Sequence, residues 1–238
     1  MTRKDELKAN LEAVRARIRA AESAAGRAPG SARLLPVSKF HPVEDVRLLA
    51  ELGVDLVGEN REQEARAKAE ELAATGTDIG IAMIGQIQSK KANAVARWAR
   101  EVHSLDSIKL AHGLDRGMEL ALERDERTSD TLPCLVQLSA DGDAQRGGVA
   151  AKDVDDVVDA VLNTQHLKFA GFMVVPPLDA DPTEVFTHAR SLTDAHSDSL
   201  GRPLVLSAGM SGDFEQAIAC GSDIVRVGTG VLGPRSVG

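Results

Sequence analysis

One lysine stands where a short apolar segment ends. Lys39 follows residues 34–38, which read Leu-Leu-Pro-Val-Ser and are typical of a short buried strand. A lysine amine that is shielded from water loses its proton more readily, and a neutral amine can attack an aldehyde to form a Schiff base. The alternative is a lysine that caps the strand and extends into water, as most lysines do. This segment alone leaves both interpretations open.

Two glycine-rich segments near the C-terminus have the composition of an anion site. Residues 207–212 read Ser-Ala-Gly-Met-Ser-Gly, and residues 226–230 read Arg-Val-Gly-Thr-Gly. Backbone N–H groups of glycines can approach an anion closely, the hydroxyls can donate to it, and a helix that begins there favours negative charge. Each glycine taken singly also fits an ordinary turn. Both segments together indicate a phosphate cradle.

The elements that must position these residues alternate along the chain. Apolar segments typical of buried strands are separated by segments with helical periodicity, and the strands number eight, which is the count for a closed (β/α)8 barrel. We expect strands at 34–38, 55–58, 79–85, 101–104, 134–138, 169–174, 204–206 and 224–227. We expect helices at 43–52, 60–74, 89–99, 107–123, 151–163, 183–199 and 212–219. In such a barrel, Lys39 and both glycine-rich segments fall at the carboxyl ends of strands, where barrel chemistry is found.

The sequence predicts one α/β domain over residues 1–238, a single TIM barrel with an extra N-terminal helix. Residues 1–30 form that helix and a linker, because apolar residues recur at helical spacing until the segment 25–30, which is rich in glycine and proline. An open doubly wound sheet is the rival, but its first strand is usually followed by a glycine-rich loop, and no glycine follows the first strand here. Pro36 counts against a central strand, since proline cannot donate to the ladder, so we expect a local bulge.

Composition excludes several classes of protein. The formal charge of -8 gives no general attraction for nucleic acid, so any anion must be held locally. Cys134 and Cys220 stand apart without zinc-like spacing, which indicates neither a disulfide framework nor a metal site. The N-terminus lacks the apolar stretch of a signal peptide, and the apolar run at 79–84 is too short to span a membrane. We therefore expect a cytoplasmic protein with no metal and no membrane partner.

A phosphate cradle and a Schiff-base lysine at the same end of one barrel suggest pyridoxal 5'-phosphate (PLP). The aldehyde and the phosphate of this cofactor lie on opposite sides of one ring. Arg226, beside the cradle, could direct its guanidinium at the ring nitrogen. Because that guanidinium stays protonated, the ring nitrogen would remain unprotonated and act as a weak electron sink.

Short motifs spread over the whole chain resemble those of one family, the pyridoxal phosphate homeostasis proteins. The final block, from Val225 through Gly233, is the most specific of them. The motifs occur in the family's order and are Val37-Ser38-Lys39, Gly58-Glu59-Asn60, Ile84-Gly85 with Gln88-Ser89, Gly171-Phe172-Met173 before Pro176, Leu206-Ser207 with Gly209-Met210-Ser211, and Val225-Arg226-Val227-Gly228-Thr229. The chain is similar to a full-length member.

The resemblance implies a barrel similar to the cofactor domain of alanine racemase, with PLP bound as an internal aldimine. Lys39 would form the aldimine, Arg226 would face the ring nitrogen, and Asn60 would line the pocket. The phosphate would be held by Ser207, Gly228 and Thr229. Members of the family are regarded as carriers or regulators of PLP without an established reaction, so PLP-dependent apo-enzymes are expected partners.

At three positions this chain differs from the residue that is usual in the family. Arg61 stands where an aromatic residue often follows the asparagine, Gln86 where a histidine is frequent, and Lys90 where an asparagine is frequent. None of the three is among the expected cofactor contacts. They bear instead on any partner or second ligand that uses the middle of the barrel rim.

Amino-acid racemisation is the alternative function, and a class I aldolase is a third. A racemase needs an acid and a base on opposite faces of the cofactor, and Lys39 can supply only one. The comparable racemases use a tyrosine from a partner subunit, whereas this chain has no tyrosine. His103 is a candidate for slow activity, although a structural histidine fits as well. Without a second domain to carry dimer contacts, we expect a monomer.

Glu59, next to Asn60, allows two interpretations. It could act as a general base. A carboxylate at the end of a strand that accepts hydrogen bonds from backbone N–H groups explains it equally well.

Overall fold

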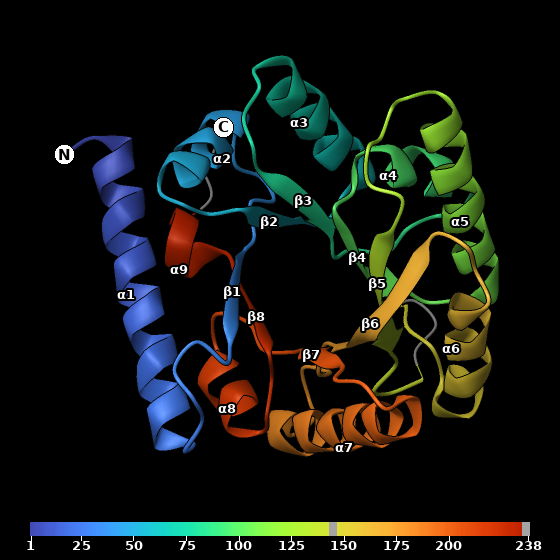
Figure 1. Cartoon of the computed structure of the whole chain (residues 1–238). Coiled ribbons are helices and arrows are strands. Elements are labelled where there is room, and N and C mark those ends of the chain that lie inside the picture. Colours follow the sequence, from blue (N-terminus) through green and yellow to red (C-terminus); the bar gives the residue numbers. More distant parts are fainter. Residues whose placement is uncertain (143–146, 235–238) are drawn as a thin grey trace.

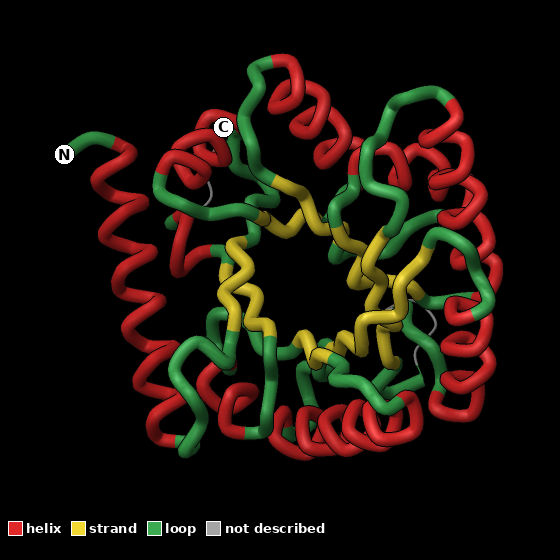
Figure 2. The backbone as a smooth tube through the Cα atoms, in the orientation of Figure 1, coloured by secondary structure: helices red, strands yellow, loops and turns green. Residues whose placement is uncertain are grey.

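Eight parallel strands form an inner ring, and helices form an outer layer around it (Figures 1 and 2). The computed structural model describes residues 1–142 and 147–234. The strands are β1 (Arg33–Pro36), β2 (Leu56–Glu59), β3 (Gly80–Met83), β4 (Glu101–Leu105), β5 (Leu132–Leu138), β6 (Leu167–Val174), β7 (Val205–Ser207) and β8 (Ile224–Val227). The helices are α1 (Arg3–Ala24), α2 (Val43–Glu51), α3 (Glu62–Ala74), η1 (Ser89–Lys91), α4 (Ala92–Trp98), α5 (Ile108–Glu123), η3 (Ala151–Asp153), α6 (Val154–Leu162), α7 (Pro182–Leu200), α8 (Phe214–Ala219) and α9 (Thr229–Leu232). The predicted (β/α)8 barrel is confirmed.

The barrel is nearly closed, and its seam lies between β1 and β2. Neighbouring strands pair in parallel from β2 round to β8, and β8 pairs with β1. Across the seam, β1 and β2 meet only at a bridge between Val37 and Gly58. Backbone N–H groups of a parallel strand point alternately to its two neighbours. Since Val37 donates to Val227 of β8, the nitrogen of Pro36 faces the seam. The expected bulge is therefore wrong, because Pro36 lies where no ladder donor is needed.

The predicted N-terminal helix is α1, and it covers the outside of the barrel beside α2, α8 and α9 (Figure 1). Thr2 and Asp5 form a capping box at its start, which satisfies orphan N–H groups there. The residues at helical spacing on its apolar face are buried, namely Leu7, Leu11, Val14 and Ile18. Burying this stripe against the barrel stabilises the helix far more than helix propensity does.

Apolar residues fill two regions, one inside the ring of strands and one between strands and helices. The inner cluster consists of Leu35, Leu56, Ala82, Leu135, Met173 and Ile224, one residue from each of six strands. Alternation along the strands sends the intervening residues outward against the helices. The barrel interior is thus a packed core, and in barrels of this kind chemistry is found at the carboxyl-end rim.

An ion cluster lies inside the barrel near the amino ends of the strands. Arg33 of β1 makes two hydrogen bonds of 3.0 and 2.8 Å to the carboxylate of Glu101 of β4. The same carboxylate contacts Nε2 of His103 at 2.7 Å, and His103 is fully buried. This cluster joins β1 to β4 across the end of the barrel opposite the rim that carries Lys39.

The structure also bears on membrane-spanning helices, cysteines and metal sites. No helix in the described part of the chain is both long and apolar enough to cross a membrane. Cys134 is buried and Cys220 is partly buried, and both are free thiols. Within residues 1–142 and 147–234, no group of three acidic, histidine or cysteine side chains is placed to hold a metal ion.

Candidate functional site

Lys39 lies in a turn at the carboxyl-end rim of the barrel. The strand β1 ends at Pro36, so Lys39 is three residues beyond it and not its last residue. Val37 donates to the carbonyl of Val227 at 2.9 Å, and Ser38 donates to the carbonyl of Gly58 at 3.0 Å. The backbone before Lys39 is therefore held between the ends of β8 and β2. Lys39 itself is half-buried.

Asn60 lies beside this turn. Val37 and Gly58 are bridge partners across the seam, and Lys39 and Asn60 each lie two residues beyond them. Its Oδ1 atom is buried and has no hydrogen-bond partner among the described residues. A side chain at Gly85 would overlap the backbone of Asn60, so only glycine permits this close approach. Asn60 and Gln86 help to line a cavity of about 270 Å³ at the rim. An unpartnered amide oxygen that lines a cavity is suited to accept a hydrogen bond from a ligand.

Arg226 and Ser207 are joined directly. Nη1 of Arg226 donates to the carbonyl and to Oγ of Ser207, both at 2.8 Å, and Nη2 donates to the carbonyl of Val174 at 2.9 Å. These bonds use three of the five N–H groups of a guanidinium. Arg226 is only 4% exposed, and burial lowers its pKa to about 10. No carboxylate among the described residues is hydrogen-bonded to it, so a buried cation keeps two donors for a ligand.

Gly228 and Thr229 follow β8 at the same rim. Gly228 is the N-cap of the short helix α9, and Thr229 is its first residue. The first N–H groups of a helix have no acceptor within the helix. A Cβ atom on Gly228 would lie 3.5 Å from the carbonyl oxygen of Val37, which places this backbone against the segment that leads to Lys39.

The residues predicted for the site thus form one arc of the rim. Strand order runs β6, β7, β8, β1, β2 along it. Arg226 and Ser207 occupy the β7–β8 side, Gly228 and Thr229 follow β8, and Lys39 and Asn60 close the arc on the β1–β2 side. Of these residues only Asn60 lines the rim cavity itself. The backbone donors and the buried cation are of types that bind an anion, and the amine is of a type that reacts with an aldehyde.

Sequence analysis missed a buried ion cluster beneath the Lys39 turn. The sequence left Glu59 open as a general base or as an acceptor of backbone N–H groups, and in the structure its Oε1 accepts from Ser38 Oγ and from Lys68 Nζ, both at 2.6 Å. Lys68 also pairs with Glu64 at 2.9 Å. Burial raises the pKa of Glu59, although Lys68 opposes this. The spacing of Glu64 and Lys68, four residues apart on one helix, was the available signal.

The three departures from the family pattern lie at or near the rim. The guanidinium of Arg61 stacks over the ring of Phe40, 4.8 Å from its centroid. Gln86 is exposed and hydrogen-bonds the side chain of Asp106, whose pKa is raised by burial. Lys90 is exposed on η1. Arg61 therefore contacts the residue after Lys39, so it is closer to the cofactor residues than the sequence suggested.

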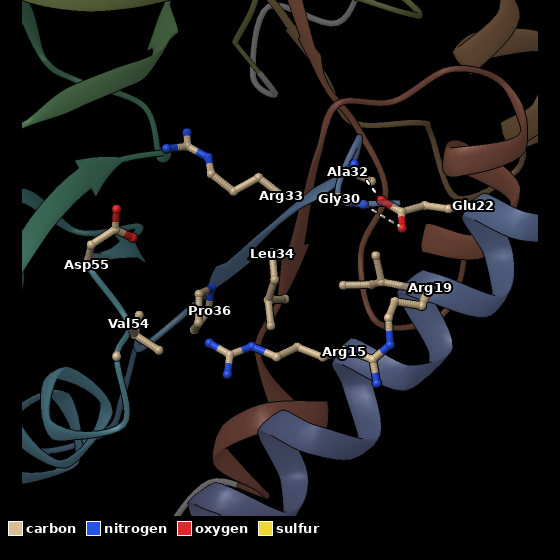
Figure 3. Close-up of a pocket in the computed structure, with 12 residues that line it drawn as sticks. Arg15, Arg19, Glu22, Gly30, Ala32, Arg33, Leu34, Pro36, Val54 and Asp55 are labelled. Carbon is tan, nitrogen blue, oxygen red and sulfur yellow. Dashed lines mark hydrogen bonds between the residues drawn. The ribbon is translucent and has the colours of Figure 1, made fainter. Parts of the chain in front are cut away.

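A larger cavity, of about 510 Å³, lies away from this rim, between α1 and the β1–β2 seam (Figure 3). Arg15 and Arg19 extend into it from α1, with Leu34 and Pro36 on the opposite wall. Glu22 is not free there, because it accepts hydrogen bonds from the backbone N–H groups at positions 30 and 32. This cavity lies beside the seam and contains none of the predicted site residues, so the rim is the candidate site.

The fold and the rim define a class of protein. The family model described as "Alanine racemase, N-terminal domain" matches residues 9–236. The alanine racemase of Corynebacterium glutamicum aligns with a TM-score of 0.63 at 18% identity, covering 95% of this chain and 62% of the racemase. At that identity the match establishes the fold alone. The chain is a barrel of the alanine racemase N-terminal type.

Closer relatives specify the family. The "Pyridoxal phosphate homeostasis protein" of Corynebacterium glutamicum is 55% identical over 222 residues, covering 93% of this chain and 99% of the relative. The protein of that name from Escherichia coli K12 is 32% identical and covers 95% of both chains. PipY of Synechococcus elongatus PCC7942, solved with PLP bound, aligns with a TM-score of 0.79 at 29% identity, covering 95% of this chain and 100% of PipY. The chain belongs to the pyridoxal phosphate homeostasis protein family.

Proposed function

We propose that this chain binds PLP at the carboxyl-end rim and acts in PLP homeostasis as a carrier or regulator. The observation that supports this most strongly is Arg226, a buried guanidinium whose described hydrogen bonds go only to two carbonyls and a hydroxyl. Asp213 attracts this cation electrostatically, but no carboxylate among the described residues is hydrogen-bonded to it, and burying a cation with so little compensation is costly. An electronegative ring nitrogen accepting from its remaining donors would offset part of that cost.

Each residue of the arc then has a defined role. Lys39 supplies the amine that forms the aldimine, and Asn60 lines the pocket with its unpartnered amide oxygen. Ser207, Gly228 and Thr229 hold the phosphate with hydroxyls and backbone N–H groups. When bound, PLP supplies an electrophilic aldehyde and an electron sink, and the guanidinium of Arg226 keeps that sink weak.

A racemase is not favoured by the positions of the possible acids and bases. The chain contains no tyrosine. His103 is hydrogen-bonded to Glu101, the first residue of β4, and lines a cavity with Arg33 near the amino ends of the strands. A second proton carrier for a substrate at the carboxyl-end rim is therefore not provided by His103. Relatives that are 55% and 44% identical to this chain also carry the homeostasis name.

The direct test is to mix purified protein with PLP and follow visible absorbance. We expect a yellow protein, and borohydride reduction followed by peptide mass spectrometry should locate the adduct at Lys39. Lys39→Ala should remove this adduct while circular dichroism stays unchanged, because Lys39 lies in a turn with no core role. A protein that remains colourless at saturating PLP would contradict the cofactor proposal, and conversion of an L- to a D-amino acid at enzyme-like rates would contradict the carrier proposal.

The proposed carrier role extends to partners and assembly. We expect PLP-loaded protein to restore activity to an apo-form of a PLP-dependent enzyme, in the cytoplasm and as a monomer. Transfer is measured by mixing the two proteins under conditions where free PLP is trapped, and assembly by sedimentation. Failure to transfer would leave binding intact and favour a regulatory role.

A further inference from the structure

The turn that carries Lys39 has a strained backbone. Phe40, the next residue, has a φ of +64°, in the left-handed region. A bulky residue rarely adopts this conformation, because its Cβ atom crowds the neighbouring carbonyl. Strain of this kind persists only where the surroundings hold it, and it concentrates at functional sites. Contacts with neighbouring residues must therefore hold Phe40 in this conformation.

The buried cluster below the turn holds the residues on both sides of Lys39. The backbone N–H of Phe40 donates to Glu64 Oε1 at 2.7 Å. The carbonyl of Ser38 accepts from Lys68 Nζ at 2.8 Å, and its hydroxyl donates to Glu59 at 2.6 Å. Lys68 joins these contacts, because it also pairs with both carboxylates.

An ammonium group suits this position particularly well. It has three donors and no acceptor. All three are matched, by Ser38 O, Glu59 Oε1 and Glu64 Oε1, which come from the β1 end, β2 and α3. Lys68 is 6% exposed and Glu59 is fully buried, so water competes little for these bonds. A buried ion cluster is expensive to keep for stability alone.

We propose that Lys68 is a positioning residue for Lys39. By binding Ser38, Glu59 and Glu64 together, it fixes the strained turn and so holds the Lys39 backbone at the rim. Lys68 takes no part in the covalent linkage. The inference rests on the proposed function, since it assigns Lys68 a role only if Lys39 binds the aldehyde of PLP.

The experiment measures the rate at which PLP forms the borohydride-trapped adduct at Lys39. We expect Lys68→Met to slow this rate at least tenfold, because the turn then relaxes from its left-handed conformation. Lys91→Met is the matched control. Lys91 lies on η1 and pairs with Glu62 of α3, the helix that carries Lys68, at 3.3 Å, but it does not contact the turn. The rate of Lys91→Met should therefore equal that of the unsubstituted protein.

A second substitution separates positioning from general stability. Asparagine adopts the left-handed region more readily than phenylalanine, so Phe40→Asn in the Lys68→Met background should restore most of the rate. A purely structural role for Lys68 would show no such rescue. Should Lys68→Met not fold, Glu64→Ala removes the acceptor of the Phe40 N–H and leaves the Glu59–Lys68 pair, and it should slow the rate several-fold.

The outcomes distinguish this inference from the proposed function. No adduct at Lys39 in the unsubstituted protein would overturn both. A normal adduct in the unsubstituted protein together with an unchanged rate in Lys68→Met or Glu64→Ala would overturn only the role of Lys68. Slowing by Lys68→Met without rescue by Phe40→Asn would also overturn it, because the effect would then not act through the turn.

Discussion

The hydroxyl of Ser207 serves two neighbours at once. Its oxygen accepts from Arg226, which leaves its hydrogen free to point toward the proposed phosphate. The expectation from sequence was a phosphate donor only. The structure adds that Ser207 also orients the guanidinium, so the two ends of the proposed cofactor would be coupled through one side chain.

We expect Ser207→Ala and Thr229→Val each to weaken PLP binding. The loss should be about 0.5–1.5 kcal/mol for one hydrogen bond, or about 1.5–3 kcal/mol where the bond is to the charged phosphate. Equilibrium titration of visible absorbance measures it. Ser191→Ala is a matched control, since its hydroxyl bonds only the preceding turn of α7. Unchanged affinity in both site variants would show that the phosphate binds elsewhere.

Gly85 is a second position where one added atom, a Cβ, would disturb the site. We expect Gly85→Ala to destabilise the protein by about 1–3 kcal/mol, because the added Cβ would overlap the backbone of Asn60. The shift of Asn60 should also weaken PLP binding. Urea unfolding measures the first effect and titration the second. Gly76→Ala serves as a comparison at a loop position where the added atom meets nothing within 4 Å but φ is positive. If Gly85→Ala were no more destabilising than Gly76→Ala, the contact with Asn60 would be unimportant.

How far the site could be predicted depends on the sequence distance of its contacts. Lys39, Asn60 and Arg226 were found because each belongs to a short motif at a strand end. Lys68 was not found, because its partners come from three elements and its burial follows only from the packing of α3 against β2. The strain at Phe40 likewise has no sequence signal, since phenylalanine does not favour the left-handed region.

At the scale of elements, the ion cluster of β1 and β4 predicts how stability depends on pH. Burial alone would raise the pKa of Glu101, but hydrogen bonds from His103 and Arg33 lower it to about 2 from an ordinary value of 4.5. Stability from this carboxylate is therefore complete above pH 4.5 and is lost as the pH falls toward 2. Burial also lowers the pKa of His103, so protonation of the unfolded chain below its ordinary value of 6.5 acts in the same direction.

We expect the free energy of unfolding to fall by on the order of 3 kcal/mol between pH 5 and pH 2 through Glu101. Urea unfolding across this range measures it. Glu101→Gln removes the titrating carboxyl and should flatten this part of the profile, at the cost of lower stability at pH 7. An equally steep acid limb in Glu101→Gln would show that other carboxylates cause it.

The elements themselves were predicted more closely than their ends. Periodicity located the strands, but helical segments expected at 89–99 and 151–163 each begin with a separate 3₁₀ turn, η1 and η3. Helix ends are set by local hydrogen bonds at single residues, which periodicity does not resolve. Pro36 lies in a strand as predicted. The strand tolerates a proline there because its nitrogen faces the seam between β1 and β2, and the position of that seam is known only from the strand order of the barrel.

At the scale of the whole molecule, the number of strands predicted the barrel. The contacts that join the first helix to α2 and α9 were not predicted. Arg3 of α1 makes two hydrogen bonds to Asp45 of α2, at 3.0 and 2.6 Å, and a third to the carbonyl of Leu232 in α9 at 2.7 Å. The hydrogen bonds to Asp45 are the main cause that raises the pKa of Arg3. One side chain thus joins the first helix to both α2 and the last helix described.

We expect Arg3→Met to destabilise the protein by about 1–3 kcal/mol, because it leaves the buried carboxylate of Asp45 and the carbonyl of Leu232 without these donors. Lys4→Met is the matched control. Lys4 also joins α1 to α2 through Glu51 at 2.7 Å, but both of those side chains are about half exposed, so its loss should cost less than about 1 kcal/mol. Thermal unfolding at neutral pH measures both variants, and each kcal/mol corresponds to roughly 2–4 °C for a chain of this size. Equal effects of the two substitutions would mean that the burial of Asp45 adds no stability beyond that of an exposed contact between α1 and α2.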